Sequence, residues 1–279
     1  AAGLADRDRQ RAALHAGQRR LDDRQLDAQQ FAQSHRRPCL TLFGRHAADR
    51  GGEVRVPCRV HRPVLAHRAG RVLGLVGQNG AGKSTLMNIV GGNVAADSGS
   101  MELSSLPYAP SNARDAEGRG VGFIHQELNL FPNLTIAENI HIARMPIGRF
   151  GLIDRAALHA RTTELLRDVD LDFPPDTPLG RLSPGERQLV EVAKALQIDA
   201  RILIFDEPTT SLTPRETSRL FALIRRLRQA GIAIIYISHV LSDVEGLADD
   251  IAVLRDGRLV ASAPTSDLPA ARMVKLMLG

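Results

Sequence analysis

The sequence is poor in several features that would indicate particular classes of protein. Only two of its 279 residues are cysteines, Cys39 and Cys58, and they form neither a Cys-x-x-Cys pair nor a cluster with histidines at metal-ligand spacing. We therefore expect neither a disulfide nor a structural zinc site. The longest apolar runs, Ile202–Phe205 and Ile232–Ile237, are too short to span a bilayer, and no apolar signal-peptide core is present at the N-terminus. These absences favour a cytosolic chain.

Lysine is also scarce, and the basic charge is unevenly distributed. The net charge is +5, but residues 1–70 hold 14 arginines against 7 acidic residues, whereas residues 71–279 hold 22 basic against 24 acidic residues. The hydrophobic content of 43% is enough for a substantial core. The basic excess therefore belongs to the first quarter of the chain and not to the part that can fold around that core.

Two hypotheses account for residues 1–69, whose hydrophobic pattern predicts no recognisable fold. The first is a basic arm that binds nucleic acid. The second is a disordered or out-of-frame segment, because three lysines against 33 arginines indicate a GC-rich coding sequence, in which a shifted frame also encodes Arg, Ala, Gly, Pro and His. We favour the second, because so little of the segment could support a packed core.

A phosphate-binding loop follows this segment. An apolar run over 72–76 predicts a buried strand, and the next nine residues fit G-x-x-x-x-G-K-[ST] at every fixed position. We expect the loop amides and the start of the helix behind it to bind a triphosphate, with Lys83 at its β and γ phosphates and Ser84 on Mg²⁺. The helix is expected to end at Gly91-Gly92. The residues expected to bind the nucleotide here are Gly77, Gln78, Asn79, Gly80, Ala81, Gly82, Lys83, Ser84 and Thr85.

Two later apolar runs predict strands that end in polar residues. The run 202–205 is followed by Asp206 and Glu207, and the run 231–237 is followed by Ser238 and His239. In a parallel sheet such ends face the site. We expect Asp206 to hold Mg²⁺ through water, Glu207 to polarise the water that attacks the γ-phosphate, and His239 to contact that phosphate.

Residues 128–198 read as a helical region. Thr135 and Glu138 fit a capping box, Asp154–Val169 has an amphipathic pattern, and 172–178 is a proline-rich break. In the helix that follows Leu182, Ser183 is the expected N-cap, with Pro184 at its first position and Glu186 at its third. Elsewhere the pattern predicts strands over 101–103 and 121–124, a polar connection over 107–120 and a helix over 217–229.

Together these motifs resemble the ATP-binding subunit of an ABC transporter over about residues 70–279. The resemblance rests on the phosphate loop, Gln126, Leu-Ser-Pro-Gly-Glu at 182–186, Ile-Leu-Ile-Phe-Asp-Glu-Pro at 202–208 and His239. It implies an α/β phosphate-loop (RecA-like) ATPase core with an inserted helical subdomain at about 128–198. His-Gln-Glu-Leu-Asn-Leu at 125–130 and Val-Leu-Arg-Asp-Gly-Arg at 253–258 are similar to bacterial importers of the ribose, galactose and xylose type.

The resemblance also implies roles and partners. Glu207, His239 and Gln126 would be catalytic, and Mg²⁺ would lie among Ser84, Gln126 and Asp206. Ser183 and Gly185 would bind the nucleotide of a second ATPase module, supplied by a homodimer or by a missing tandem half. ATP and Mg²⁺ would be the cofactors. The other expected partners are membrane-spanning permease subunits and, indirectly, a periplasmic sugar-binding protein, which places the chain at the cytoplasmic face of the membrane.

The chain departs from the family pattern at three places. Pro184 and Glu186 replace the usual Gly and Gln, residues 44–70 contain no aromatic side chain to stack on adenine, and the chain stops at 273–279, where the first of two tandem modules would end. Two alternatives to sugar import therefore stay open. One is a soluble ABC-type ATPase that acts on nucleic acid or ribosomes, although nucleic acid is not the partner we expect, and the other is an inactive truncated remnant.

Overall fold

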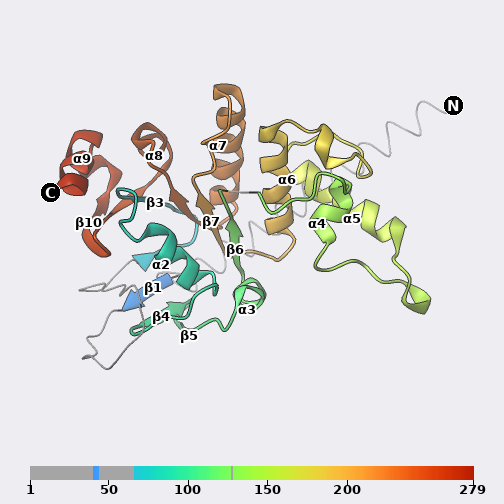
Figure 1. Cartoon of the computed structure of the whole chain (residues 1–279), viewed down its shortest axis with the longest axis horizontal. Helices are drawn as coiled ribbons and strands as arrows, with labels where there is room; N and C mark the ends of the chain where they lie inside the picture. The colour runs from blue at the N-terminus through green and yellow to red at the C-terminus, as the bar shows by residue number, and fades with distance from the viewer. Residues whose placement is uncertain (1–39, 44–65, 127) are drawn as a thin grey trace.

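The computed structural model describes residues 40–43, 66–126 and 128–279 (Figure 1). The larger of its two sheets has the strand order β10-β9-β3-β8-β7-β6. All neighbouring strands in it are parallel except the β9–β10 hairpin. Its strands are β3 (Val72–Val76), β6 (Val121–Ile124), β7 (Ile202–Asp206), β8 (Ala233–Ile237), β9 (Asp250–Arg255) and β10 (Arg258–Pro264).

The smaller sheet is antiparallel and includes strands that the sequence pattern did not predict. Its order is β2-β1-β4-β5, and its strands are β1 (Leu40–Phe43), β2 (Ala66–His67), β4 (Ser100–Leu103) and β5 (Leu106–Tyr108). β1 and β2 lie within residues 1–69, for which no element was expected. The predicted polar connection over 107–120 is also wrong, because it contains the end of β5 and the helix α3 (Ala113–Gly118).

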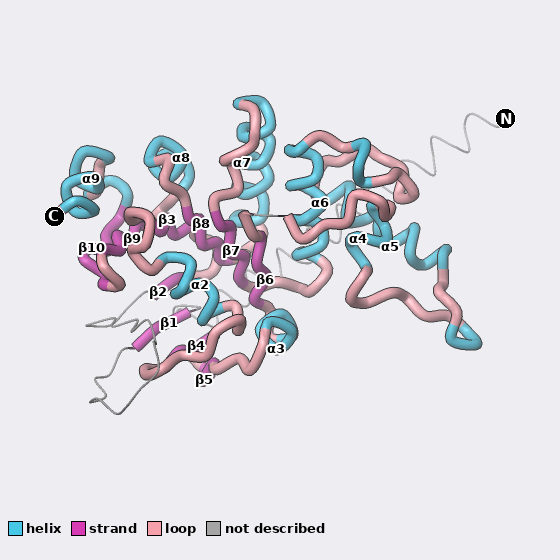
Figure 2. The backbone as a smooth tube through the Cα atoms, viewed as in Figure 1, coloured by secondary structure: helices cyan, strands magenta, loops and turns pink. Residues whose placement is uncertain are grey.

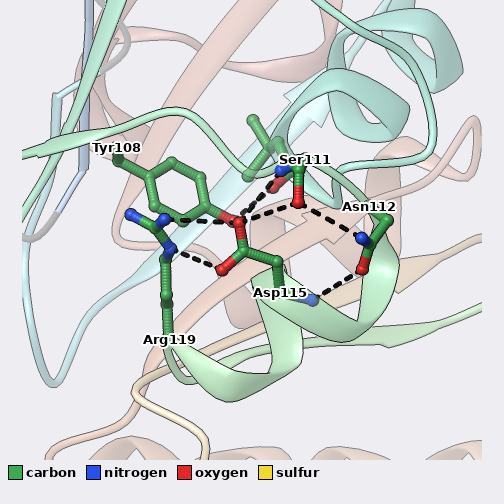
Figure 3. Close-up of polar contacts among 6 residues, drawn as sticks. Tyr108, Ser111, Asn112, Asp115 and Arg119 are labelled. Carbon is green, nitrogen blue, oxygen red and sulfur yellow. Dashed lines mark hydrogen bonds and ion pairs between the residues drawn. The ribbon is translucent and has the colours of Figure 1, made fainter.

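Local polar contacts, which a search for hydrophobic periodicity does not detect, explain that second error (Figure 3). The Asn112 side chain accepts a hydrogen bond from the backbone N–H of Asp115 and caps α3, and Arg119 binds the Asp115 carboxylate. The hydroxyl of Tyr108 is buried and donates to the backbone oxygen of Val90, 2.6 Å away. Burial raises the pKa of Tyr108 above its usual range, so the hydroxyl remains a donor.

Helices lie on both faces of the larger sheet (Figure 2), and its inner strands β3, β7 and β8 are buried. Successive side chains of a strand point to opposite faces, so Val72 and Val76 join one core cluster and Leu73 and Leu75 the other. The first cluster includes residues of α7 (Pro214–Gln229), α8 (Leu241–Leu247) and α9 (Ala270–Leu278). The second includes residues of α2 (Lys83–Val90) and α3. Burial on both faces explains why the strands read as continuous apolar runs.

The predicted helical region packs beyond the β6 edge of this sheet (Figure 1). Its helices are α4 (Ile136–His141), α5 (Arg155–Asp168) and α6 (Pro184–Leu196), with short 3₁₀ turns at Arg149–Gly151 and Leu179–Arg181; a third 3₁₀ turn, Thr265–Asp267, precedes α9. The capping boxes predicted for α4 and α6 are confirmed. Buried residues of the region share a core cluster with β3 and β8.

The helix expected over 217–229 begins earlier than the sequence pattern predicts. α7 starts at Pro214, because Thr213 is its N-cap and forms a capping box with Glu216. Among the described residues, none of the helices combines the length and the apolar character that a membrane crossing requires.

We predict that Gly92→Ala destabilises the chain, because Gly92 follows α2 with φ of 75° and an added Cβ would lie 2.5 Å from the backbone oxygen of Asn112. The expected loss is about 2 kcal/mol or more, from backbone strain plus the displaced loop. Gly246→Ala in α8 is the matched control, since nothing lies within 4 Å of its added Cβ and a gain of about 0.5 kcal/mol is expected. Equal midpoints of urea unfolding for the two variants would contradict this account.

Candidate functional site

Strand register brings the predicted site residues other than Ser183 and Gly185 to one edge of the larger sheet. Leu75 of β3 and Asp206 of β7 both pair with Ile237 of β8, and Ile124 of β6 pairs with Phe205 of β7. The residues one or two positions after these strands therefore lie along the same carboxyl edge. They are Gly77 after β3, Gln126 after β6, Glu207 after β7 and His239 after β8.

Backbone packing holds the phosphate loop in place between β3 and α2. A Cβ at Gly77 would come within 2.4 Å of the backbone oxygen of Leu254, so only glycine fits there. The N–H of Gly257, in the turn between β9 and β10, donates to the backbone oxygen of Ala81 at 3.0 Å. The loop is thus braced by the hairpin, while the exposed segment 78–80 and the start of α2 face outward.

Lys83 lies inside this loop with its side chain only 6% exposed. Its Nζ donates to the backbone oxygens of Gly77 at 2.8 Å and Gln78 at 3.1 Å. Burial lowers the pKa of Lys83, while Glu207 and Asp206 oppose that shift. The ammonium is therefore held on the loop by carbonyl oxygens and lies within electrostatic reach of both acids.

The two acids at the end of β7, Asp206 within the strand and Glu207 directly after it, are partly buried. Burial first, and then the Glu207 charge, raises the pKa of Asp206, whereas Lys83 lowers it. The Glu207 backbone is in the left-handed region at φ 48°, and its N–H donates to the Ile237 oxygen at 2.9 Å. A non-glycine residue at such a φ is strained, and strained positions concentrate at functional sites.

His239 completes the group by contacting Glu207 directly. Its Nδ1 lies 3.1 Å from Oε2 of Glu207, and its side chain is 52% exposed. The structure therefore brings together Lys83, Asp206, Glu207 and His239. The first and last of these residues are 156 positions apart in the sequence. Gln126, two residues after the end of β6, is exposed on the same edge, but within the described residues no hydrogen bond or ion pair joins it to the acids.

The residues fit a bound cation only when a phosphate is also present. Within the described part of the chain, no group of three or more His, Cys, Asp or Glu side chains could hold a metal ion. Asp206 and the exposed Ser84 offer one carboxylate and one hydroxyl. This donor set suits Mg²⁺, which is typically bound through one or two protein oxygens together with substrate phosphates and water.

Ser183 and Gly185 are not brought to this edge. They lie at the start of α6, and Figure 1 shows α6 and α2 on either side of α7. Both instead contact Glu216 at the start of α7: Ser183 Oγ and the Gly185 N–H donate to its Oε1 at 3.0 and 3.1 Å. The sequence reasoning missed this contact of Glu216 with two predicted site residues, and the Thr213-x-x-Glu216 spacing was the signal that could have found the helix start.

A phosphate loop whose neighbouring strands end in a carboxylate pair and a histidine defines a nucleotide-binding α/β protein of the phosphate-loop class. The sequence profile of the ABC transporter family matches residues 61–210. The chain belongs to that family.

Relatives and solved structures agree with this assignment. The chain is 44% identical over 210 residues to a ribose/galactose/methyl galactoside import ATP-binding protein of Agrobacterium fabrum, covering 75% of this chain and 42% of that protein. It is 46% identical over 215 residues to the ribose import ATP-binding protein RbsA of Rhodopirellula baltica, covering 77% and 42%. An ATP-binding cassette of an ABC transporter in its ADP conformation is 21% identical with a TM-score of 0.72, over 87% of this chain and 99% of that one.

The chain spans less than half the length of these two relatives. The expectation of an ABC-type α/β fold is confirmed, and the structure shows that Leu40–Phe43 and Ala66–His67 also contribute to a sheet. The family match begins at residue 61, nine positions before the predicted domain start.

We predict that Asp206→Asn raises the melting temperature at pH 7 by roughly 2–4 °C, because it removes a buried charge next to Glu207. The pKa of Asp206 is higher in the folded state than its ordinary value of 3.8. The ionised carboxylate therefore lowers the free energy of unfolding at pH values above the folded-state pKa, and this cost disappears at pH values below 3.8. The advantage of the variant should therefore shrink on acidification. Asp256→Asn, at a side chain 91% exposed, is the matched control and should change little. A destabilised Asp206→Asn at pH 7 would contradict the account.

Proposed function

We propose that the chain is the ATP-binding and ATP-hydrolysing part of an importer that carries a monosaccharide into the cell. The observation that supports ATP hydrolysis most strongly is the meeting of Lys83, Asp206, Glu207 and His239 at one sheet edge. The choice of a sugar rests on the relatives, which are named for ribose, galactose and methyl galactoside import.

In this proposal the phosphate loop binds the β and γ phosphates of ATP. Its amides and the start of α2 supply donors and partial positive charge. The Lys83 ammonium would exchange the Gly77 and Gln78 oxygens for phosphate oxygens, which are stronger acceptors. When bound, Mg²⁺ supplies positive charge to the phosphates, and Ser84, Asp206 and Gln126 are the side chains that would hold it.

Glu207 and His239 would act at the γ-phosphate. The Glu207 carboxylate can accept a hydrogen bond from the attacking water and orient it, because it is fixed by its backbone bond to Ile237 and by the Thr210 hydroxyl on its own carbonyl. With hydrogen on both ring nitrogens, His239 could donate to a γ-phosphate oxygen through Nε2 while its Nδ1 donates to Glu207. Positioning and charge, and no covalent intermediate, would then account for catalysis.

The proposed nucleotide site is completed by a second ATPase module. Ser183 and Gly185 of that module would bind the γ-phosphate at the start of its α6. The second module is either another copy of this chain or a further part of a longer protein, since the relatives are more than twice as long as the matched segment.

We further propose that residues 70–279 form the ATP-binding domain and that the helical subdomain, about 128–198, faces the membrane-spanning permease subunits. Four apolar side chains of this region are more than half exposed, namely Phe131, Ile147, Leu152 and Ile153, and such side chains suit a protein partner. The chain would thus lie at the cytoplasmic face of the membrane, and a periplasmic sugar-binding protein would deliver the sugar to the permease. Nucleic acid is not the partner we propose, since the basic excess is confined to residues 1–70.

We predict that Glu207→Gln keeps the affinity for Mg·ATP within about threefold but slows phosphate release by roughly 100-fold or more, because the amide cannot act as a base. Chelating Mg²⁺ should abolish hydrolysis in the unmodified chain. Phosphate release and nucleotide binding are measured on the full 279-residue chain.

Glu117→Gln on α3 serves as the control for the same chemical change away from the site and should leave both quantities unaltered. If the Glu207→Gln variant hydrolyses ATP at the original rate, the proposed role of that carboxylate is contradicted.

A further inference from the structure

Two helices meet through one carboxylate at the start of α6. Oε1 of Glu216 accepts hydrogen bonds from Ser183 Oγ at 3.0 Å and from the Gly185 N–H at 3.1 Å. Oε2 of the same carboxylate accepts from the N–H and hydroxyl of Thr213, at 2.9 and 2.8 Å, and so caps its own helix. Oε2 therefore accepts hydrogen bonds from the N-cap of α7, and Oε1 accepts hydrogen bonds from the start of α6.

The carboxylate occupies a position suited to an anion. Helix α6 has 13 residues, and the N-terminus of such a helix presents unpaired N–H groups and partial positive charge. Gly185 is buried, and a Cβ there would come within 2.5 Å of the Glu216 carboxylate. The glycine thus lets the charged group approach the helix start closely.

Glu216 keeps its negative charge at any physiological pH. Hydrogen bonds from the Thr213 N–H and hydroxyl, followed by those from Ser183 and Gly185, lower the pKa of Glu216 to about 2. Protonation therefore does not release the carboxylate, and another anion must displace it.

We propose that the Glu216 carboxylate occupies the Ser183–Gly185 site of the free chain in place of a phosphate. The carboxylate must withdraw from this site before the terminal phosphate of a nucleotide held by the other module can bind there. This inference rests on the proposed function, because only a composite site brings such a phosphate to α6. Glu216 then sets how much ATP is needed to close two modules on each other.

The contact between Glu216 and the start of α6 also lies close in the chain to the acids at the end of β7. Only eight residues separate Glu216 from Glu207, and the Thr210 hydroxyl binds the Glu207 carbonyl oxygen at 2.8 Å. Withdrawal of Glu216 from α6 would free one of the contacts near the segment 208–213, which lies between the acids and α7. Nucleotide binding at one module could in this way alter the loop beside the other.

A purely structural contact is the competing explanation. In that case Glu216 would only hold α6 and α7 together, and neutralising it would lower stability without changing the ATP requirement. The two explanations differ in the direction of one measurable quantity, the Mg·ATP concentration at which half of the chains associate.

The test uses the full chain carrying Glu207→Gln, so that bound ATP persists, with and without Glu216→Gln. Sedimentation velocity over a Mg·ATP titration gives the half-association concentration. We expect it to fall about threefold to tenfold in Glu216→Gln, since the competing charge at the helix N-terminus is removed while the glutamine can still cap α7. Glu138→Gln, the corresponding capping-box position of α4, is the matched control and should leave it unchanged.

The inference is overturned if Glu216→Gln leaves the half-association concentration unchanged or raises it, while Glu138→Gln leaves it unchanged. The proposed function is then unaffected. Glu216→Ala checks the result, since it removes both oxygens and should also lower the ATP requirement even if α7 is less stable. No association in any variant, together with no binding of Mg·ATP, would overturn the proposed function and this inference with it.

Discussion

Parallel pairing of β3 and β7 with β8 between them determines where the phosphate loop, the two acids and His239 can lie. The shared register at Ile237 places the phosphate loop, the carboxylate pair and the histidine at the same edge, although they are far apart in the chain. The apolar residues that make this pairing possible are buried on both faces of the sheet. Core packing and site geometry therefore depend on the same hydrogen-bonded strands.

The electrostatics of the free chain are balanced internally at both halves of the proposed nucleotide site. On the phosphate loop, the Lys83 ammonium is satisfied by two backbone oxygens. At the start of α6, the donors of Ser183 and Gly185 are satisfied by Glu216. Buried or partly buried polar groups are costly when left without partners, so each half is paired within the chain itself. A triphosphate would replace both sets of contacts, since it accepts from the ammonium on one module and from the helix start on the other.

Motifs with a local physical cause were predicted correctly from the sequence. The buried strands at 72–76 and 202–205, the second of which the structure extends by Asp206, the end of α2 at Gly91 and the capping boxes of α4 and α6 follow from patterns within a few residues. Contacts between distant segments could not be read in that way. The pairing of Leu40–Phe43 with β4 joins segments about sixty residues apart, and the bond between Glu216 and Ser183 spans 33 positions. The roles of the site residues in catalysis and of 128–198 as a subdomain stay predictions.

The central claim is that the edge of the larger sheet binds ATP through the phosphate loop, and calorimetric titration of Mg·ATP into the 279-residue chain tests it most directly. The account predicts one site per chain, with affinity at least tenfold weaker in Lys83→Ala, provided that the melting curve of the variant shows it folded. No heat of binding to the unmodified chain, or equal affinity in the two proteins, would contradict the claim.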